Sequence, residues 1–450
     1  GYYNTALGLK SLRLNSTGYT NVSLGPNTFE NNSTGWGNIG IGELAGYNNT
    51  TGNENIGIGR ESLNSNKANS GSLAIGIRAM QFADDRIAGR ATGNTAIGYE
   101  ALKGSSTPAD NIGENNTALG FQTLLNNTSG YGNIAVGKNS LSSNTSGFYN
   151  TAIGIAALNS NTTGNDNTAI GRSSMLFNTS GKFNSALGNN SLNANTSGWY
   201  NTALGSETML NNTVGSSNTA IGNAALVQNV ANSGSVAIGY HALSNADNRT
   251  SGRITGNTAV GFESLSGSDT PSNNTGQYNT AVGYSTLRNN SSGEGNTTLG
   301  YYSLNVNTTG SFNTALGNGA LADNTIGDYN VSIGYQSLRK NISNDFNIAI
   351  GGRDALFNNL TGGNNVDIGT SSLYNTNANN NTAIGHDAGY SNTSGSNNIF
   401  IGASASGSTA TVSNEITLGN SSNNVIRAAT QTITSLSDAR DKKNISNLTF

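Results

Sequence analysis

Glycine returns through this chain at a nearly constant interval, and this regularity limits the possible folds more than any other feature of the sequence. Each repeat glycine follows an aliphatic residue, and the series runs from Gly8 to Gly419. The dominant step is 17 residues, and 24 glycines fit the series. Such a repeat predicts an array in which each unit packs only on its neighbours. The usual estimate of domain number from chain length therefore does not apply.

The residues around the repeat glycine predict a short strand. With this glycine as position zero, Asn stands at minus 4, Thr, Val or Ile at minus 3, a small residue at minus 2, an aliphatic residue at minus 1, and Leu or Met at plus 4. Positions minus 3 and minus 1 share one face of a strand, and minus 2 and the glycine share the other. We expect the aliphatic face to point into the coil, where the plus 4 residue joins it, and the Ala and Gly face to point outward.

The residues between the aliphatic positions favour stacked β-coils over helices. Gly, Asn, Ser and Thr fill these stretches, and none of them favours a helix interior. Parallel pairing of successive coils about 4.8 Å apart would give a rod on the order of 115 Å long. The predicted fold class is therefore all-β, a parallel β-roll or β-solenoid of about 24 coils. The Asn at minus 4 would either form a ladder of side-chain amides along the rod or serve as a left-handed turn residue.

Charge and composition argue against several kinds of partner. The formal charge of -3 offers no basic surface to nucleic acid or to an anionic membrane, and no apolar stretch is long enough to cross a bilayer. Cysteine is absent, and His241 and His386 are isolated, so we expect no metal site and no cofactor. Only 34% of the residues are hydrophobic, but their strict placement argues against a disordered chain.

A single coil is too thin to be stable alone, which favours a homo-oligomer. Its interior would hold about three aliphatic side chains, worth roughly 1.5 to 3 kcal/mol each. Ordering the backbone costs roughly 1 to 2 kcal/mol per residue. Ladder hydrogen bonds and neighbouring coils must supply much of the difference, and burial of the outward Ala and Gly face against another copy would add to it. We therefore expect three copies around a common axis.

The consensus resembles the head repeats of trimeric autotransporter adhesins, whose Asn-Ser-Val-Ala-Ile-Gly units form a left-handed parallel β-roll in a trimer. Ser235 to Gly239 reads Ser-Val-Ala-Ile-Gly, and the resemblance covers roughly residues 1 to 419. The adhesin coil is shorter than 17 residues, so the turn geometry and the handedness do not carry over. Similar Asn-Thr-Ala-Ile-Gly arrays also occur in phage and bacterial surface fibres.

A duplicated block with longer steps interrupts the array. Ser70 to Asn127 matches Ser233 to Asn290, 163 residues later, and both contain steps of 22 residues. Insertions in a solenoid become loops on one face. Their charged residues predict a ligand contact or interchain ion pairs, with a plain solvated loop as the alternative: Asp84, Asp85, Arg86 and Arg90 in the first copy, Asp247, Arg249 and Arg253 in the second.

Aromatic residues gather at two positions of the repeat. They precede the minus 4 Asn, as in Trp36, Phe148 and Trp199, or follow the glycine, as in Tyr99 and Tyr240. Such rows could stack on sugars, but packing along the rod is the favoured interpretation.

The last residues carry a different signal. Ser437 to Ile445 resembles the opening of the endosialidase-type intramolecular chaperone domain, found at the end of phage tail spikes and fibres. That domain aligns three chains and then releases itself by cutting the peptide bond at the serine. The resemblance implies a Ser437 and Lys442 dyad, supported by Asp438, Arg440 and Asn444, while Asp441 replaces the usual leucine. A neutral lysine amine next to a serine can accept the hydroxyl proton.

These observations give a shaft over residues 1–419, a connector strand segment over 420–436 and the start of a chaperone domain over 437–450. The expected function is a structural and adhesive fibre, an extracellular phage tail fibre that binds a host surface receptor such as a glycan. A bacterial trimeric surface adhesin is the alternative. A polysaccharide-degrading enzyme would need two carboxylates around one glycosidic bond, and the shaft acids occur singly. An ice-binding solenoid is disfavoured because the expected parity turns Thr at minus 3 inward.

Overall fold

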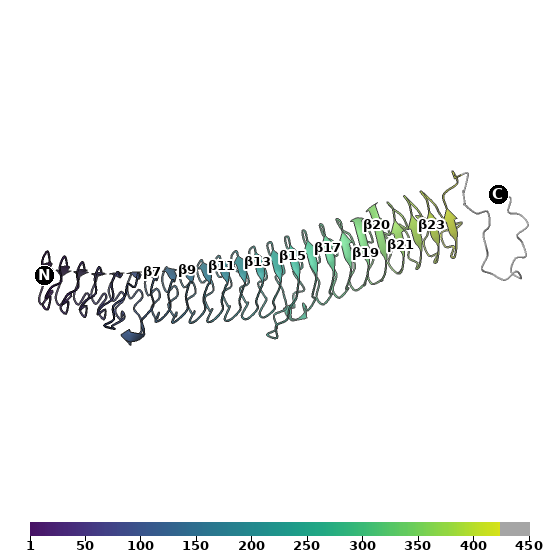
Figure 1. The fold of residues 1–450 in the computed structure, drawn as a ribbon. Helices are drawn as coiled ribbons and strands as arrows, with labels where there is room; N and C mark the ends of the chain where they lie inside the picture. The colour runs from purple at the N-terminus through teal and green to yellow at the C-terminus, as the bar shows by residue number, and fades with distance from the viewer. Residues whose placement is uncertain (424–450) are drawn as a thin grey trace, which may run out of the picture.

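The computed structural model describes residues 1–423, and these form one continuous rod of stacked coils (Figure 1). Each coil contributes one short strand to a single 24-stranded sheet, and each strand pairs in parallel with the next strand along the chain. Paired residues are mostly 17 positions apart, as in Ala152 with Ala169 and Ala169 with Ala186. The prediction of a parallel β-solenoid of about 24 coils is confirmed. Most of the expected connector and all of residues 437–450 lie outside the described residues.

The strands of the first half of the rod are β1 (Thr5–Leu7), β2 (Val22–Leu24), β3 (Ile39–Ile41), β4 (Ile56–Ile58), β5 (Leu73–Ile75), β6 (Thr95–Ile97), β7 (Thr117–Leu119), β8 (Ile134–Val136), β9 (Thr151–Ile153), β10 (Thr168–Ile170), β11 (Ser185–Leu187) and β12 (Thr202–Leu204). Those of the second half are β13 (Thr219–Ile221), β14 (Val236–Ile238), β15 (Thr258–Val260), β16 (Thr280–Val282), β17 (Thr297–Leu299), β18 (Thr314–Leu316), β19 (Val331–Tyr335), β20 (Ile348–Arg353), β21 (Val366–Ile368), β22 (Thr382–Ile384), β23 (Ile399–Ile401) and β24 (Ile416–Leu418). Two 3-10 turns, η1 (Pro108–Asp110) and η2 (Pro271–Asn273), lie in the inserted loops.

The expected orientation of the strands is wrong. The residue at minus 2 is the one that points into the coil: Ala152, Ala169 and Ala220 are fully buried. The residues at minus 3 and minus 1 point outward, and Ile153 remains 39% exposed. The two faces do alternate as predicted, but the small residues face the narrow interior and the larger side chains face outward. The Ala and Gly face is therefore not a surface that could contact another copy.

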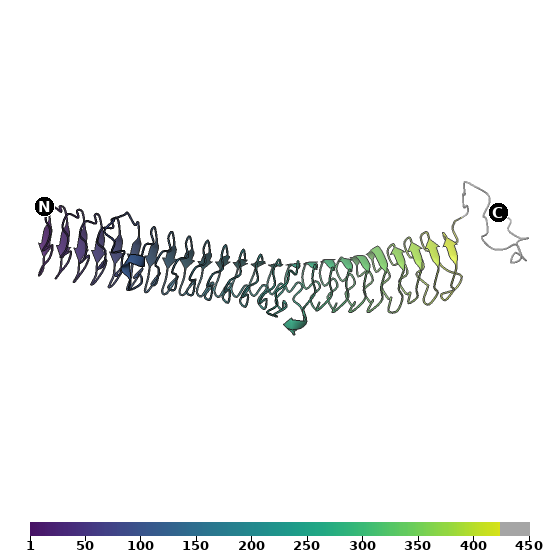
Figure 2. The same ribbon diagram turned by 60° about the horizontal axis from the view of Figure 1, so that its bottom comes forward.

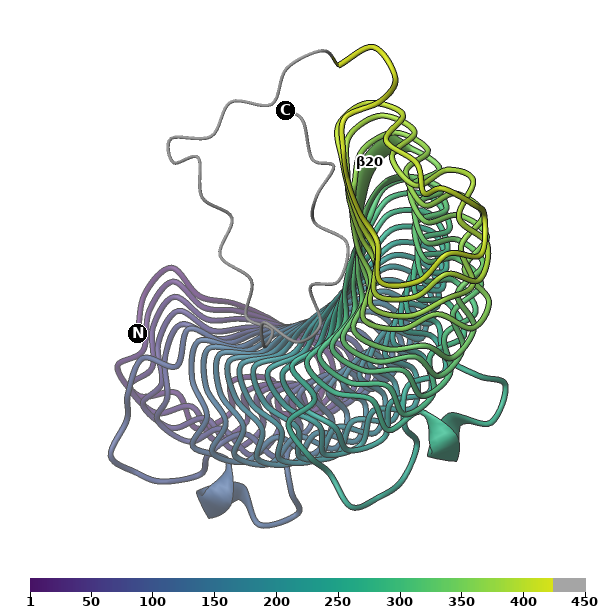
Figure 3. The ribbon, with the colours of Figure 1, turned by 90° about the vertical axis from the view of Figure 1, so that its right-hand side faces the viewer.

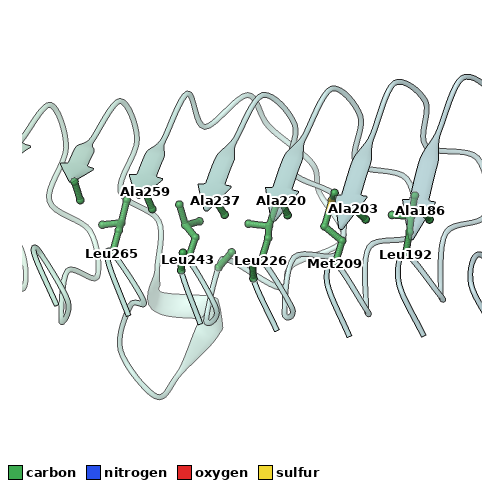
Figure 4. Close-up of a cluster of buried hydrophobic side chains, with 14 of the residues drawn as sticks. Ala186, Leu192, Ala203, Met209, Ala220, Leu226, Ala237, Leu243, Ala259 and Leu265 are labelled. Atoms are coloured by element: carbon green, nitrogen blue, oxygen red, sulfur yellow. The ribbon is translucent and has the colours of Figure 1, made fainter. Parts of the chain in front are cut away.

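The width of the interior explains this orientation. Leucine or methionine at plus 4 enters from the wall opposite the strand, and its side chain meets the small residue at minus 2, as Leu226 and Ala220 do in Figure 4. The residue at plus 3 is also small, for example Ala157 or Ser174. The expectation that the plus 4 residue lies in the interior is confirmed, but most coils bury one large aliphatic side chain and not three.

Two ladders of buried asparagines run along the rod. At minus 4, Asn150 donates its side-chain amide to Asn133 Oδ1 of the preceding coil (3.1 Å) and to the Gly164 carbonyl (2.9 Å). At plus 7, Asn161 donates to Asn144 Oδ1 (2.9 Å) and to the same Gly164 carbonyl (3.0 Å). The first ladder was one of the two expected alternatives. The second ladder was not expected, because its residues read as part of a turn.

The rod is bent and twisted (Figures 1 and 2). Viewed from one end in Figure 3, the coils follow an arc, with the strands along its inner side. The inserted loops project from the outer side of the same arc. The outward side chains of the strands and the loops therefore lie on opposite sides of the rod.

Candidate functional site

The strand face, which we define as the outward residues at minus 3 and minus 1, is the most extended surface feature of the rod. Successive rungs lie in register, so that Ile153, Ile170 and Leu187 form one row and Thr151, Thr168 and Ser185 form another. In the aliphatic row, Leu187 and Leu204 are 45% and 41% exposed. A continuous apolar stripe of this kind is typical of an interaction surface.

The charged residues of the first loop pair mainly with one another. Asp84 is almost fully buried and accepts hydrogen bonds from the Arg86 guanidinium, from Nε to Oδ1 (2.9 Å) and from Nη2 to Oδ2 (2.6 Å). Arg90 Nε lies 3.5 Å from the same carboxylate. Burial would raise the pKa of Asp84, but the hydrogen bonds from Arg86 and the charge of Arg90 outweigh it and hold that pKa below its usual value. Asp85 contacts Lys67 at 3.4 Å.

The second loop repeats this arrangement. Asp247 accepts a hydrogen bond of 2.6 Å from Arg249 Nη2, and Arg253 Nη2 lies 3.2 Å from Asp247 Oδ2. Here too, burial would raise the pKa of the Asp247 carboxyl, but hydrogen bonds from Arg249 lower it below its usual value. The predicted loop residues are thus brought together as ion pairs within one chain. Their contact with a ligand stays a prediction.

The aromatic residues stack on one another along the rod, as the favoured interpretation predicted. In the row of Phe312, Tyr329 and Phe346, the ring centroids are 5.1 and 5.2 Å apart and the rings are nearly parallel. A second row runs through Tyr240, Phe262, Tyr284 and Tyr301. Because neighbours cover both faces of a ring inside a row, only the ring edges and the row ends remain for a sugar.

One buried carboxyl group was missed by the sequence analysis. Asp367 occupies the minus 2 position of β21, where most other coils carry Ala, and its strand neighbours are Ala349 and Ala383. Burial raises the pKa of Asp367 to about 8. The nearby Ser372 hydroxyl donates to the Gly369 carbonyl instead. The signal in the sequence was the acidic residue in Val366-Asp367-Ile368 at a position of small residues.

In the part of the chain that the structure describes, residues 1–423, no group of three or more His, Cys, Asp or Glu side chains could hold a metal. None of its helices is long and apolar enough to cross a membrane. The residues of the predicted self-cleavage site, Ser437, Asp438, Arg440, Lys442 and Asn444, lie outside it.

No protein-family model matches this chain, and no curated protein sequence matches it with significance.

Proposed function

We propose that this chain is the shaft of an extracellular attachment fibre in which three copies wind around a common axis. The observation that carries the proposal is the strand face, whose half-exposed aliphatic row continues from coil to coil. Burial of each half-exposed Ile or Leu against another copy would contribute about 1 kcal/mol. Summed over the rod, this would supply the stability that the thin interior, with about one large apolar side chain per coil, lacks.

The curvature of the rod supports the same arrangement. The strands lie on the inner side of the arc (Figure 3), so copies wound around one axis would bring their strand faces together at the centre. The inserted loops and the aromatic edges would then face outward, where a receptor can reach them. Three copies, not two, are favoured by the resemblance to the trimeric adhesin heads.

The sedimentation mass of the protein tests this proposal. We expect three times the 46.0 kDa of one chain. The triple variant Ile153→Lys, Leu187→Lys, Leu204→Lys places charges in the aliphatic row and should dissociate the complex. Val214→Lys is the matched control, because Val214 is equally exposed but lies on a turn. The assembly would be refuted if the wild-type protein sediments as a single chain and melts at the same temperature as the triple variant.

A phage tail fibre is the favoured setting because of the tail motif. There, the Ser437 hydroxyl would attack the carbonyl carbon of Leu436 while its proton passes to the Lys442 amine. The C–N bond between Leu436 and Ser437 would then break as Lys442 passes the proton to the departing Ser437 nitrogen, which leaves Leu436 joined to the Ser437 oxygen as an ester. Water would then hydrolyse the resulting ester and release the chaperone segment. Ser437→Ala in the full-length protein should give an uncut product, and unaltered processing would reject the dyad. A bacterial surface adhesin remains the alternative, and it would carry a membrane anchor in place of the chaperone.

Ice binding is the second candidate, because the structure removes the objection raised from the sequence. Thr151, Thr168 and Thr202 point outward in register, which is the arrangement that can order water. The row turns with the twist of the rod, however, so no long flat plane is available (Figure 3). We expect no thermal hysteresis from the purified protein, and a clear hysteresis gap would favour ice binding over attachment.

A further inference from the structure

The two copies of the duplicated block share a backbone arrangement but differ in one surface region. In both copies the loop asparagine donates to a backbone carbonyl of the preceding coil: Asn111 to Phe82, and Asn274 to Asn245. In both, the same asparagine accepts a hydrogen bond of 2.9 Å from a serine amide. The side chains beside this contact can therefore be compared position by position.

In the second copy these side chains line an open groove of about 290 Å³ next to η2. Three successive coils and the loop contribute to it, and nearly all of its side chains are polar: His241, Asn245, Glu263, Asp269, Arg288 and Asn289. Glu263 and Arg288 form an ion pair of 2.8 Å across the groove. Within residues 1–423, the side chains of Asn245, Asp269 and Asn289 make no hydrogen bond, so they are free to bind a ligand.

In the first copy the equivalent surface is already occupied by contacts within the chain. Phe82 replaces Asn245 and lies under Lys103, whose Nζ is 5.7 Å from the ring centroid. Lys103 also pairs with Glu100 at 2.8 Å, and Gln122 donates to the same carboxylate at 2.9 Å. Leu125 replaces Arg288. The first copy therefore provides an internal control for the second.

We propose that the groove of the second copy binds an uncharged saccharide. Flat carboxylate and amide groups can accept from and donate to neighbouring hydroxyls of a sugar, and the groove holds two of each. The ion pair neutralises Glu263, which leaves Asp269 as the unpaired charge and disfavours acidic sugars. The volume is at the lower end for ligand sites, enough for about one or two sugar units. This inference deepens the proposed attachment role and rests on it.

The chain contains only two histidines, which gives a direct readout. His241 lines the groove, whereas His386 lies in the coil of β22. In protein labelled with ¹³C at histidine Cε1, we would titrate methyl β-galactoside, methyl α-glucoside and methyl α-mannoside, with sodium glucuronate as the acidic comparison. The His241 signal should shift saturably with at least one of the neutral glycosides, while the His386 signal stays in place.

Variants that exchange the two copies locate the site. Asn245→Phe copies the first block and should weaken binding at least tenfold, whereas Phe82→Asn in the first block should leave the His241 titration unchanged. Asn289→Ala is a smaller change that should also weaken binding, should Asn245→Phe not fold. Three results would overturn the proposal. The His241 signal could fail to respond to any glycoside, Asn245→Phe and Asn289→Ala could both bind as tightly as the wild-type protein, or glucuronate could give a stronger response than every neutral glycoside.

Adhesion of the protein to host cells separates this inference from the attachment role. Loss of both adhesion and glycoside binding in Asn245→Phe supports the two together. Unchanged adhesion by Asn245→Phe overturns the groove as the receptor site and leaves the attachment role standing. Glycoside binding without any adhesion by the wild-type protein overturns the attachment role alone.

Discussion

The middle of the rod and its two end regions fill the same narrow interior with different side chains. In the middle coils, an alanine at minus 2 meets a leucine or methionine at plus 4, as in Ala152 and Leu158. Near the N-terminal end, Gly40 and Gly46 occupy these two positions of the β3 coil. The ring of Phe29 from the preceding coil, which is fully buried, fills the space that both glycines leave.

The C-terminal region solves the same problem from the opposite wall. Phe400 stands at minus 2 of β23, and Gly389 stands at plus 4 of the preceding coil. A Cβ on Gly389 would lie 2.6 Å from the Phe400 ring. The interior therefore keeps its filled volume across neighbouring coils, and either wall can supply the large side chain.

The β21 coil departs from the middle coils mainly in the chemistry of its interior. Asp367 takes the place of an alanine in the row of inward residues, between Ala349 and Ala383, and carries a carboxyl group into the interior. A large ring in one coil can be balanced by glycines in a neighbouring coil, which we call volume exchange. A buried carboxyl group has no such compensation and can only become neutral or find a partner.

Asp367 should give the largest effect of any single position. Its pKa of about 8 in the folded rod exceeds its usual value of 3.8, so its contribution to stability is complete below pH 4 and is lost as the pH rises through about 8. The loss is on the order of 5 kcal/mol. Asp367→Ala should therefore melt near the wild-type temperature at pH 4 and well above it at pH 8.

Thermal melting at pH 4, 6 and 8 checks this, with Asp110→Ala, an exposed residue of η1, as the control. The ion-paired carboxyls Asp84 and Asp247 have lowered pKa values, so they lose stabilisation only as the pH falls through those values. An Asp367→Ala variant whose gain is the same at pH 4 and pH 8 would contradict the buried-acid explanation.

Gly46 tests volume exchange directly. Gly46→Leu restores the residue found in the middle coils but drives it into the Phe29 ring, at a cost of about 3 kcal/mol. The triple variant Phe29→Leu, Gly40→Ala, Gly46→Leu recreates a middle coil and should recover most of that loss. Backbone strain does not prevent this, because Leu63 adopts nearly the same φ (50°) as Gly46 (59°). The urea midpoints of the two variants measure this difference in stability. A triple variant no more stable than Gly46→Leu alone would contradict volume exchange.

The plus 4 position should reject β-branched residues for a backbone reason. Leu158 has a φ of 49°, and the large residues at this position are Leu, Met or Phe throughout the described coils. Leu158→Ile keeps the volume but should cost about 2 kcal/mol, because a β-branched residue is strained in this conformation. Leu158→Met should cost less than about 1 kcal/mol. Leu204→Ile on the strand face is the matched control and should be neutral in thermal melting. Equal losses for Leu158→Ile and Leu158→Met would exclude the strain.

The sequence was sufficient for the architecture, because the period of the repeat and the alternation of residue types are both local signals. The inward face was assigned wrongly because alternation distinguishes two faces but does not give the distance between the walls. That distance depends on the left-handed backbone at positions such as Leu141 and on the reach of its side chain. The second ladder was missed because Asn144 in its Asn-Thr-Ser-Gly context is indistinguishable from an ordinary turn residue.

The candidate sites were less accessible from the sequence. The charged loop residues were found as deviations from the repeat, but their pairing, as in Asp84 with Arg86, is a property of the folded loop. The groove of the second copy combines side chains from three coils, so no local sequence motif predicts it. The aligned blocks did contain a signal, because Phe82 and Asn245 differ in polarity at equivalent positions.

Substitutions in the aromatic rows should have the smallest effects on stability, because the rings lie outside the interior where volume exchange applies. Tyr329 is covered on both faces, by Phe312 and Phe346, whereas Phe312 has an aromatic neighbour on one side. Each stacked contact contributes roughly 0.5 to 1.5 kcal/mol. Tyr329→Ala should therefore cost about twice as much as Phe312→Ala, and both should cost less than Gly46→Leu. Urea midpoints resolve this ratio. Equal losses at the middle and the end of the row would mean that the stacking contributes little and that the rings are retained for contacts made by their exposed edges.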